Sequence, residues 1–355
     1  MEEKTTLKKK SNSIKKLLQF ILFVGLGIFF IWFSVKDLSA EDIQMIRESV
    51  SKANNPTSWF FLSLSLLIGA LAHYLRALRS VLLLEPLHYK VRKSMSFYAV
   101  MVCYLSNLAF PRLGEVLRCT FLQQYEKVPF QKSLGTVVTE RTLDMIIWLA
   151  LLVIAILLNT SVLSNLIIDK ENEISLGLWI QNKGLSLFTN YLLYILLFIV
   201  ILLGITIYLT QKWWRNIPSL VKIKNVFAGI WQGLISIKDV KKPISFILYT
   251  IGIWVAYFLG NYFCFFALDY LSDLGPLAVF SVLVFGNIGY MIAQGGLGAY
   301  PLVVAGVLLL YGIDYNAGLA TGWITWSVQT IMILIFGFLS LILASLAKKR
   351  EVPNH

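Results

Sequence analysis

Within a window of 33 residues, six of the charged side chains interrupt apolar stretches of the sequence. They are Arg112, Glu115, Arg118, Glu140, Arg141 and Asp144. At the centre of a bilayer, one charge costs about 2.5–3.5 kcal/mol. Six uncompensated charges would exceed the stability of a typical protein, about 5–15 kcal/mol. If this part of the chain lies in a membrane, we expect these side chains to pair, to face water or to lie near the surface.

The spacing of these charges supports two compatible interpretations. On a helix, Glu115 lies three residues before Arg118, and Arg141 lies three residues before Asp144, so local ion pairs can form. Such pairs would neutralise one another and brace the structure. In the other interpretation, the guanidinium group of Arg112 or Arg141 binds a lipid phosphate through two parallel hydrogen bonds. The carboxylates would then face a cationic part of a headgroup.

A second motif, at residues 294–301, carries no charge. Its three glycines, Gly295, Gly296 and Gly298, permit positive φ angles or a close backbone approach. Free N–H groups at such a tip could form an anion-binding nest, or the glycines could simply let helices pack tightly. The polar candidates in this half of the chain are Gln294, Tyr300, Asn287 and Asn261.

The composition is that of a polytopic membrane protein. Of the 355 residues, 57% are hydrophobic and 14% are charged, whereas a soluble domain has about 25% charged residues. The net charge of +12 comes from clusters beside apolar segments, which predicts membrane topology rather than nucleic-acid binding. Cys103, Cys119 and Cys264 lack a Cys-x-x-Cys partner, so we expect buried thiols rather than disulfides or zinc ligands. No residue is predicted to be catalytic, and no metal or cofactor is predicted.

Six apolar segments are long enough to span a bilayer, which takes about 20 residues. They are 17–35, 58–84, 133–158, 191–209, 244–268 and 318–346. Two further apolar regions, 95–131 and 275–312, are interrupted near Pro111 and Gly296 respectively. The fold class predicted is therefore all-α, with six spanning helices and two broken regions.

The distribution of positive charge predicts that both termini are cytoplasmic. One set of loops and ends carries 21 Lys and Arg residues, with Arg76 and Arg79 counted among them, and the opposite set carries five. With this orientation, region 95–131 must enter and leave the membrane from the cytoplasm, and region 275–312 from outside. We therefore predict two re-entrant helical hairpins, which require protein or water around their tips.

The two hairpins lie in units of matching length and opposite orientation. The first unit covers 58–158 and the second 244–346. Interrupted segments at corresponding positions of inverted halves indicate a transport site near the bilayer midplane. The alternative is two unrelated kinks, and we favour the inverted repeat. The predicted organisation is a basic arm (1–16), one membrane domain (17–346) with a cytoplasmic linker (210–242), and a tail (347–355).

Two linkers have amphipathic patterns. One follows Ser39 and places Ile43, Ile46 and Val50 on one face of a short helix on the outer surface. The linker 210–242 repeats apolar residues at helical spacing beside lysines, which predicts a helix on the inner leaflet. His73, three residues before Arg76, is predicted to be a packing residue rather than a proton relay.

Three motifs in order give the sequence a resemblance to a known family. They are Pro111-x-x-Gly114-Glu115-x-x-Arg118, Glu140-Arg141-x-x-Asp144 and Gly295-Gly296-Leu297-Gly298. Together they resemble the lysylphosphatidylglycerol synthase transmembrane, or flippase-like, family. The resemblance implies an inner-membrane protein with two re-entrant hairpins, which in the best-known members moves an aminoacylated phospholipid between leaflets. A separate cytosolic domain makes that lipid, and we expect no synthase activity here because no such domain follows residue 346.

One departure from the family pattern affects the expected substrate. The family often has a proline before the paired glycines and an acidic residue soon after the last one. This sequence has Gln294 and Tyr300 there, which counts against a lysine-bearing lipid. The function expected is still a flippase-like transporter for a polar-headgroup lipid in the plasma membrane. The resemblance implies an aminoacylated or glycosylated headgroup.

Two alternatives stay open. One is a membrane enzyme of a polyprenyl-phosphate sugar or phospholipid pathway, with Glu115, Glu140 or Asp144 as acid or base. The other is an accessory subunit that holds a lipid-synthesising enzyme. The predicted partners are thus a phospholipid or polyprenyl lipid and such an enzyme, with no nucleic acid; the sequence gives no oligomeric state.

Overall fold

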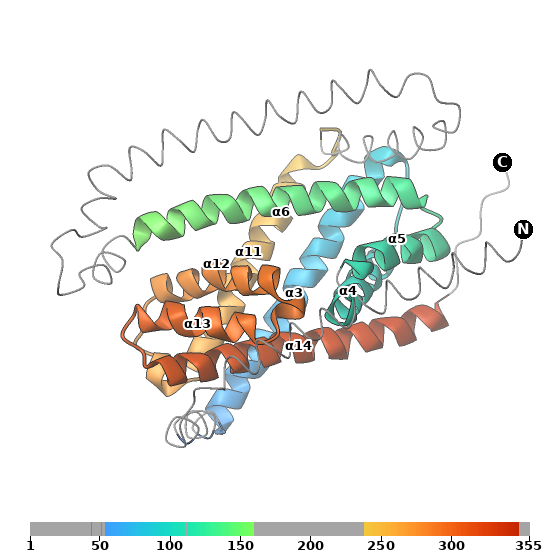
Figure 1. Ribbon diagram of the computed structural model, residues 1–355. Helices are drawn as coiled ribbons and strands as arrows, with labels where there is room; N and C mark the ends of the chain where they lie inside the picture. Colours follow the sequence, from blue (N-terminus) through green and yellow to red (C-terminus); the bar gives the residue numbers. More distant parts are fainter. Residues whose placement is uncertain (1–43, 45–50, 52–53, 111, 160–237, 348–355) are drawn as a thin grey trace, which may run out of the picture. The chain divides into compact units, whose positions relative to one another are not determined.

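The computed structural model describes residues 44, 51, 54–110, 112–159 and 238–347, and all regular structure among them is helical (Figure 1). The long helices are α3 (Pro56–Leu84), α6 (Phe130–Leu158), α11 (Pro243–Phe266) and α14 (Tyr315–Leu346). The shorter ones are α4 (Lys93–Ala109), α5 (Leu113–Glu126), α12 (Pro276–Ile292) and α13 (Ala299–Leu309). Single 3-10 turns are η1 (Glu85–Leu87), η4 (Asp269–Leu271) and η5 (Gln294–Gly296).

Four helices, α3, α6, α11 and α14, are long and apolar enough to cross a membrane. They correspond to four of the six predicted spans, which confirms the all-helical membrane class. The other two predicted spans, 17–35 and 191–209, lie outside the described residues. So do the basic arm and nearly all of both amphipathic linkers. Six spans therefore stay a prediction, as does the single domain over 17–346.

The chain divides into two compact units. One unit combines Met1–Leu152 with Ile230–His355, and the other is Val153–Gly229. Of the second unit, the structure describes the end of α6 and Asn159, whose side-chain amide donates a hydrogen bond of 2.7 Å to the carbonyl of Ala155. All contacts described below lie within the first unit.

Prolines and capping side chains set the starts of the long helices. Pro56, Pro243 and Pro276 each occupy the first turn of a helix, where a missing N–H costs nothing. Asn55 accepts a hydrogen bond from the N–H of Ser58 at 2.8 Å, and Asp314 caps α14 in the same way.

The two broken regions form two pairs of short helices, α4 with α5 and α12 with α13, and each pair packs together. The breaks lie where the sequence predicts them, at residues 110–112 and 293–298. At 1.5 Å per residue these helices are only about 16–26 Å long, shorter than a hydrocarbon core of about 30 Å. Their entry into the bilayer from opposite sides stays a prediction.

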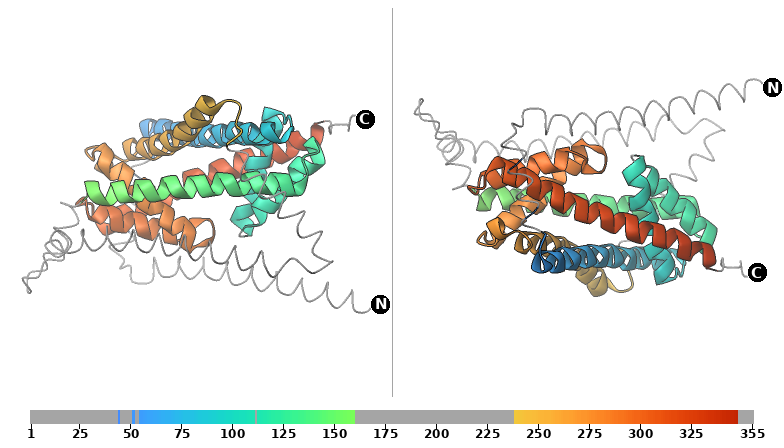
Figure 2. Two further views of the ribbon diagram at one scale, coloured as in Figure 1. Left: turned by 90° about the horizontal axis from the view of Figure 1, so that it is seen from above. Right: turned by 90° about the horizontal axis from the view of Figure 1, so that it is seen from below.

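Helix α14 contacts one helix of each pair (Figure 2). Near its start, Gly318 and Gly322 face α13, and a Cβ added at Gly322 would lie 2.5 Å from the Cα of Pro301. Further along, a Cβ at Gly337 would lie 2.9 Å from the Cβ of Leu105 in α4. Small residues on α14 therefore bring both pairs close to one helix.

The first hairpin depends on Gly114 for the close approach of its two helices. A Cβ at this position would lie 2.0 Å from the carbonyl oxygen of Cys103 and 2.7 Å from Oδ1 of Asn107. That same Oδ1 accepts a hydrogen bond from the Gly114 N–H at 2.8 Å, which satisfies a donor in the first turn of α5. The glycine of the first motif is thus explained by packing.

We predict that Gly114→Ala destabilises the protein by at least about 1–3 kcal/mol, because the new methyl group would overlap backbone that cannot move freely. The measurement is thermal unfolding of the purified protein in detergent. Gly306→Ala is the matched control, since a Cβ there meets no atom within 4 Å. Equal stability of the Gly114 variant and the control would contradict the packing role.

Candidate functional site

The innermost ion pair joins Arg118 on α5 to Glu140 on α6. Its two hydrogen bonds, at 3.0 and 2.8 Å, are bidentate, and the side chains are only 2% and 1% exposed. The guanidinium also donates a hydrogen bond of 2.7 Å to the hydroxyl of Ser80 on α3. Arg118 therefore links three helices.

A second ionic contact joins α6 to α3. Asp144 accepts from Arg76, and its other oxygen lies 2.8 Å from Nη1 of Arg79, whose side chain is fully buried. Arg76 also donates a hydrogen bond of 3.2 Å to the hydroxyl of Tyr257 on α11. One carboxylate thus serves two arginines.

Arg76 and Arg79, which were counted with the end of the second span and its loop, are both buried in this network. Without them, 19 Lys and Arg residues remain on one side of the predicted topology against five on the other. A signal for their role was present in the sequence. His73, Arg76 and Ser80 follow a spacing of three and four residues, which places a polar stripe on one face of an apolar helix.

The third pair, Arg141 with Glu115, is more exposed than the others, and we call it the open pair. The two groups are 3.1 Å apart, and the side chains are 38% and 23% exposed. The amide of Asn107 also donates to Glu115, at 3.3 and 3.4 Å to its two oxygens. Arg141 in turn donates to the hydroxyl of Tyr104 at 3.4 Å.

The predicted local pairs are wrong, although the charges do neutralise one another. Glu115 bonds to Arg141 rather than to Arg118, and Asp144 bonds to the arginines of α3. Each pair therefore connects different helices. Helical spacing places two side chains on the same face but does not determine which neighbouring helix that face meets.

Tyr104 is the common neighbour of the buried and the open parts of the network. Its ring centroid lies 5.5 Å from the guanidinium carbon of Arg141 and 6.0 Å from that of Arg76. The buried ring of His73 packs on it with a centroid distance of 4.2 Å, which agrees with the predicted packing role. A charge arriving at Arg141 would therefore be close to Arg76 of α3.

Arg112 lies apart from the ion pairs, at the tip of the first hairpin. Its side chain is exposed, and it makes no ion pair with a described residue. Its φ of 60° is left-handed, a conformation uncommon for residues other than glycine. Such strain at a tip is more common at functional sites than elsewhere.

The tips of the two hairpins are in direct contact. The side-chain amide of Gln294 donates a hydrogen bond to the backbone carbonyl of Asn107. Asn107 therefore binds Gly114, Glu115 and Gln294 at once. This role of Asn107 was not predicted from the sequence, because the contact joins residues 187 positions apart.

The glycines of the second motif form a tight turn. Gly295, Gly296 and Gly298 have φ angles of 61°, 72° and 72°, which favour glycine. The N–H groups of Gly296 and Leu297 already donate to the carbonyls of Ala293 and Gln294, at 2.9 and 3.2 Å. These two groups are thus not available to an anion, which favours the packing interpretation over a nest.

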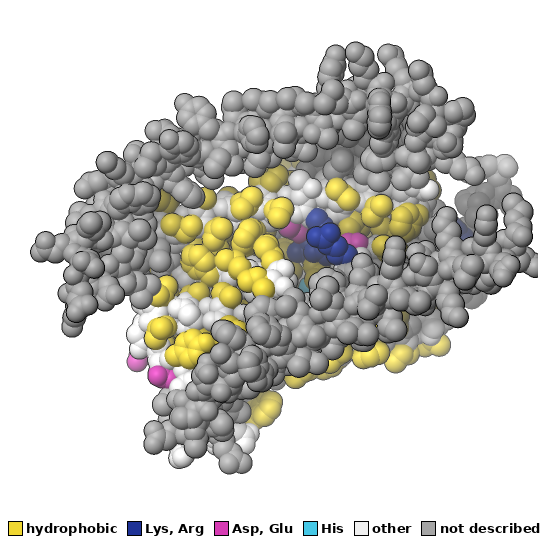
Figure 3. All heavy atoms as spheres, in the orientation of Figure 1, with side chains coloured by type: hydrophobic (Ala, Val, Ile, Leu, Met, Phe, Trp, Pro, Cys, Tyr) yellow, Lys and Arg dark blue, Asp and Glu magenta, His cyan; other side chains and the backbone are white. Residues whose placement is uncertain are grey.

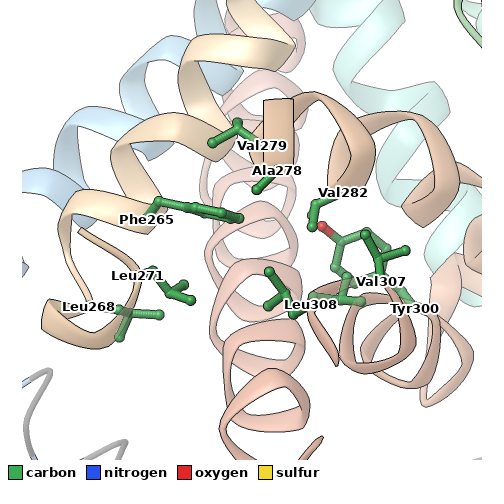
Figure 4. Packing of buried hydrophobic residues seen from close by; sticks show 10 residues of the cluster. Phe265, Leu268, Leu271, Ala278, Val279, Val282, Tyr300, Val307 and Leu308 are labelled. Carbon is green, nitrogen blue, oxygen red and sulfur yellow. The ribbon is translucent and has the colours of Figure 1, made fainter. Parts of the chain in front are cut away.

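The polar side chains near the second motif are bound within the protein. Tyr300 is buried in an apolar cluster with Val282 and Val307 (Figure 4), and its hydroxyl donates to Asn261 at 3.4 Å. Asn287 donates to the carbonyl of Leu283 in its own helix at 2.7 Å. The second hairpin therefore supplies shape and one hydrogen bond, while the first supplies the charges.

Charged side chains gather on one face of the described part of the chain. Figure 3 shows Lys and Arg side chains flanked by Asp and Glu and surrounded by apolar surface. Within the residues that are described, His, Cys, Asp and Glu form no group suited to a metal ion. Cys103, Cys119 and Cys264 are buried free thiols.

Comparison with known proteins identifies the family. The model of the family described as "Lysylphosphatidylglycerol synthase TM region" matches residues 18–337. The chain belongs to this family. No curated protein and no solved structure matches the sequence. Membership supports a membrane protein with a lipid-related function. The matched region contains both hairpins and the whole ionic network.

We predict that Arg118→Met destabilises the protein by about 3–5 kcal/mol, because it leaves the buried carboxylate of Glu140 without its guanidinium. The double variant Arg118→Met/Glu140→Met should recover much of this loss, since two apolar side chains can replace a buried ion pair. Denaturation of the variants in detergent measures both effects. If the stability lost in the double variant equals the sum of the losses of the two single variants, the pairing is contradicted.

Proposed function

We propose that this protein is a flippase-like transporter that moves a polar-headgroup lipid between the leaflets of the plasma membrane. The observation that carries the proposal is the ionic network among apolar helices, with a buried core and one half-exposed pair, Arg141 with Glu115. Ionisable groups at such depth mark substrate pathways in membrane proteins. The network would hold the headgroup while the acyl chains stay in the bilayer.

The contact between the hairpin tips supports this mechanism. Two hairpins that enter from opposite sides would meet near the midplane, where Gln294 binds the carbonyl of Asn107. Transporters with inverted repeats bind substrate at the interface of such interrupted helices. Asn107 also holds Glu115, so movement of one tip against the other would act directly on the open ion pair.

An apolar groove next to the first hairpin supports a lipid substrate. Its volume is about 520 Å³. Its lining comes from α4, α5 and α14 and includes Leu105, Leu113, Leu117, Leu334 and Phe338. Leu113 and Leu117 flank Glu115 in the sequence. On a helix, residues 113 and 117 point away from residue 115, so the groove supports an acyl chain along the hairpin and does not by itself position the headgroup.

The enzyme alternative has less support. Glu115, Glu140 and Asp144 are each held by an arginine. Each of these ion pairs joins two helices, so the positions of all three carboxylates are explained without a catalytic role. For an accessory subunit, no described contact favours one partner enzyme over another.

In liposomes, we predict that the purified protein translocates a headgroup-labelled lipid and that Arg141→Ala or Arg112→Ala abolishes most of this activity. The reason is that each variant removes a guanidinium from the route of the headgroup. The assay measures the fraction of label that an impermeant quencher reaches over time. Lys93→Ala is the control, since Lys93 is an exposed cation at the start of α4, away from the tip of the hairpin. Wild-type protein at background rate with every lipid of a broad panel would refute the proposal.

The proposed topology predicts opposite accessibility of the two tips. Cysteine replaces Phe110 in one variant and Met291 in another, because both side chains are exposed, and the three native thiols are buried. An impermeant maleimide should reach the first from the cytoplasm and the second from outside. Labelling of both positions from one side would contradict the inverted hairpins.

A further inference from the structure

The charges of the network do not balance. Among the described residues it contains four arginines and three carboxylates: Arg76, Arg79, Arg118 and Arg141 with Glu115, Glu140 and Asp144. Glu140 and Glu115 each have one arginine, whereas Asp144 has two. The excess positive charge therefore lies on α3, where both arginines are buried.

The same part of the network has unused hydrogen-bond donors. Nε of Arg76, and both Nε and Nη2 of Arg79, bond to no atom in the described part of the chain. Buried polar groups are normally satisfied, and a buried charge is costly unless it is paired. An additional anion would supply the missing negative charge.

The outer pair is the one that can exchange partners. Arg141 and Glu115 are partly exposed, whereas the side chains of Arg118 and Glu140 are almost completely buried. If Glu115 left Arg141, it would keep the hydrogen bonds from the amide of Asn107. The guanidinium would then be free to bind another group with two oxygens in a plane.

We propose that the ligand is a lipid phosphate with net negative charge, and that it binds by displacing Glu115 from Arg141. This inference rests on the proposed function and specifies its substrate class. Across the ring of Tyr104, the phosphate would also lie near Arg76, so it would offset the excess charge on α3. Arg112, whose side chain is exposed, lies at the tip of the first hairpin, three residues before Glu115.

A cationic headgroup fits this arrangement less well. An aminoacylated lipid with net positive charge would approach a network that already has an excess of guanidinium groups. The second hairpin does not compensate, because its tip presents the amide of Gln294 and the buried hydroxyl of Tyr300 and no carboxylate. We therefore expect the site to discriminate by the total charge of the headgroup.

The test measures lipid binding to the full-length protein in phosphatidylcholine nanodiscs. The probes are phosphatidylglycerol, an uncharged glycolipid without phosphate, lysylphosphatidylglycerol, and free glycerol 3-phosphate. Wild-type protein should bind phosphatidylglycerol at least about tenfold more tightly than the other three, as expected for loss of one or more charged contacts. Tighter binding of the lysylated lipid would overturn the proposal that the ligand has a net negative charge. Equal binding of glycerol 3-phosphate would overturn the proposal that the phosphate belongs to a lipid.

Two variants of the open pair should change binding in opposite directions. Arg141→Gln should weaken binding of phosphatidylglycerol by about tenfold or more, because it removes the phosphate ligand. Glu115→Gln should strengthen it by about three- to tenfold, because it removes the competing carboxylate but keeps an amide beside Asn107. Lys93→Gln, which removes an exposed cation outside the network, should leave binding unchanged.

A purely structural ion pair predicts a different result. In that case Glu115→Gln and Arg141→Gln would both lower thermal stability, and neither would tighten binding, which would overturn the exchange mechanism. Failure of the proposed function is distinguishable from this outcome. The protein could bind the anionic lipid and show opposite effects of the two variants, yet fail to translocate lipid in liposomes. That result would refute transport and support the phosphate site.

Discussion

The arrangement of the described helices depends on neutralising arginines inside an apolar protein. Helix α6 illustrates this most clearly, since 11% of its most apolar stretch is buried, against 28–33% in the three other long helices. Its contacts with α3 and α5 include the ion pairs of Glu140, Arg141 and Asp144. Because a buried ion pair that loses one partner leaves an unpaired charge, these contacts fix which faces of the helices meet.

Close packing of the backbone brings the charged groups of different helices within reach of one another. Gly114 lets α5 fold back against α4, and Asn107 then bonds to Gly114, to Glu115 and to the tip of the second hairpin. Glycines on α14 receive both hairpins in the same manner. The family motifs therefore combine two physical roles, since the glycines permit close approach and the charged residues join the helices.

Much of the fold could be predicted from the sequence, because apolar length and breaks in hydropathy are local properties. Four spans and both broken regions occur where they were expected. The local ion pairs were wrong, and the burial of Arg76 and Arg79 was not predicted, since hydropathy shows that an arginine interrupts an apolar run but not that another helix covers it. Spacing along one helix carries no information about the helix that it faces.

The sequence by itself determined that this is a helical membrane protein of the lysylphosphatidylglycerol synthase TM family, and which residue types break its apolar helices. Only the tertiary structure decided which side chains pair with one another. It joined Arg118 to Glu140, Asp144 to two arginines of α3, and Gln294 to Asn107 across 187 positions. The physical reason is that an ion pair or a hydrogen bond needs two groups within about 3 Å, and that distance is set by how helices far apart in the chain pack together.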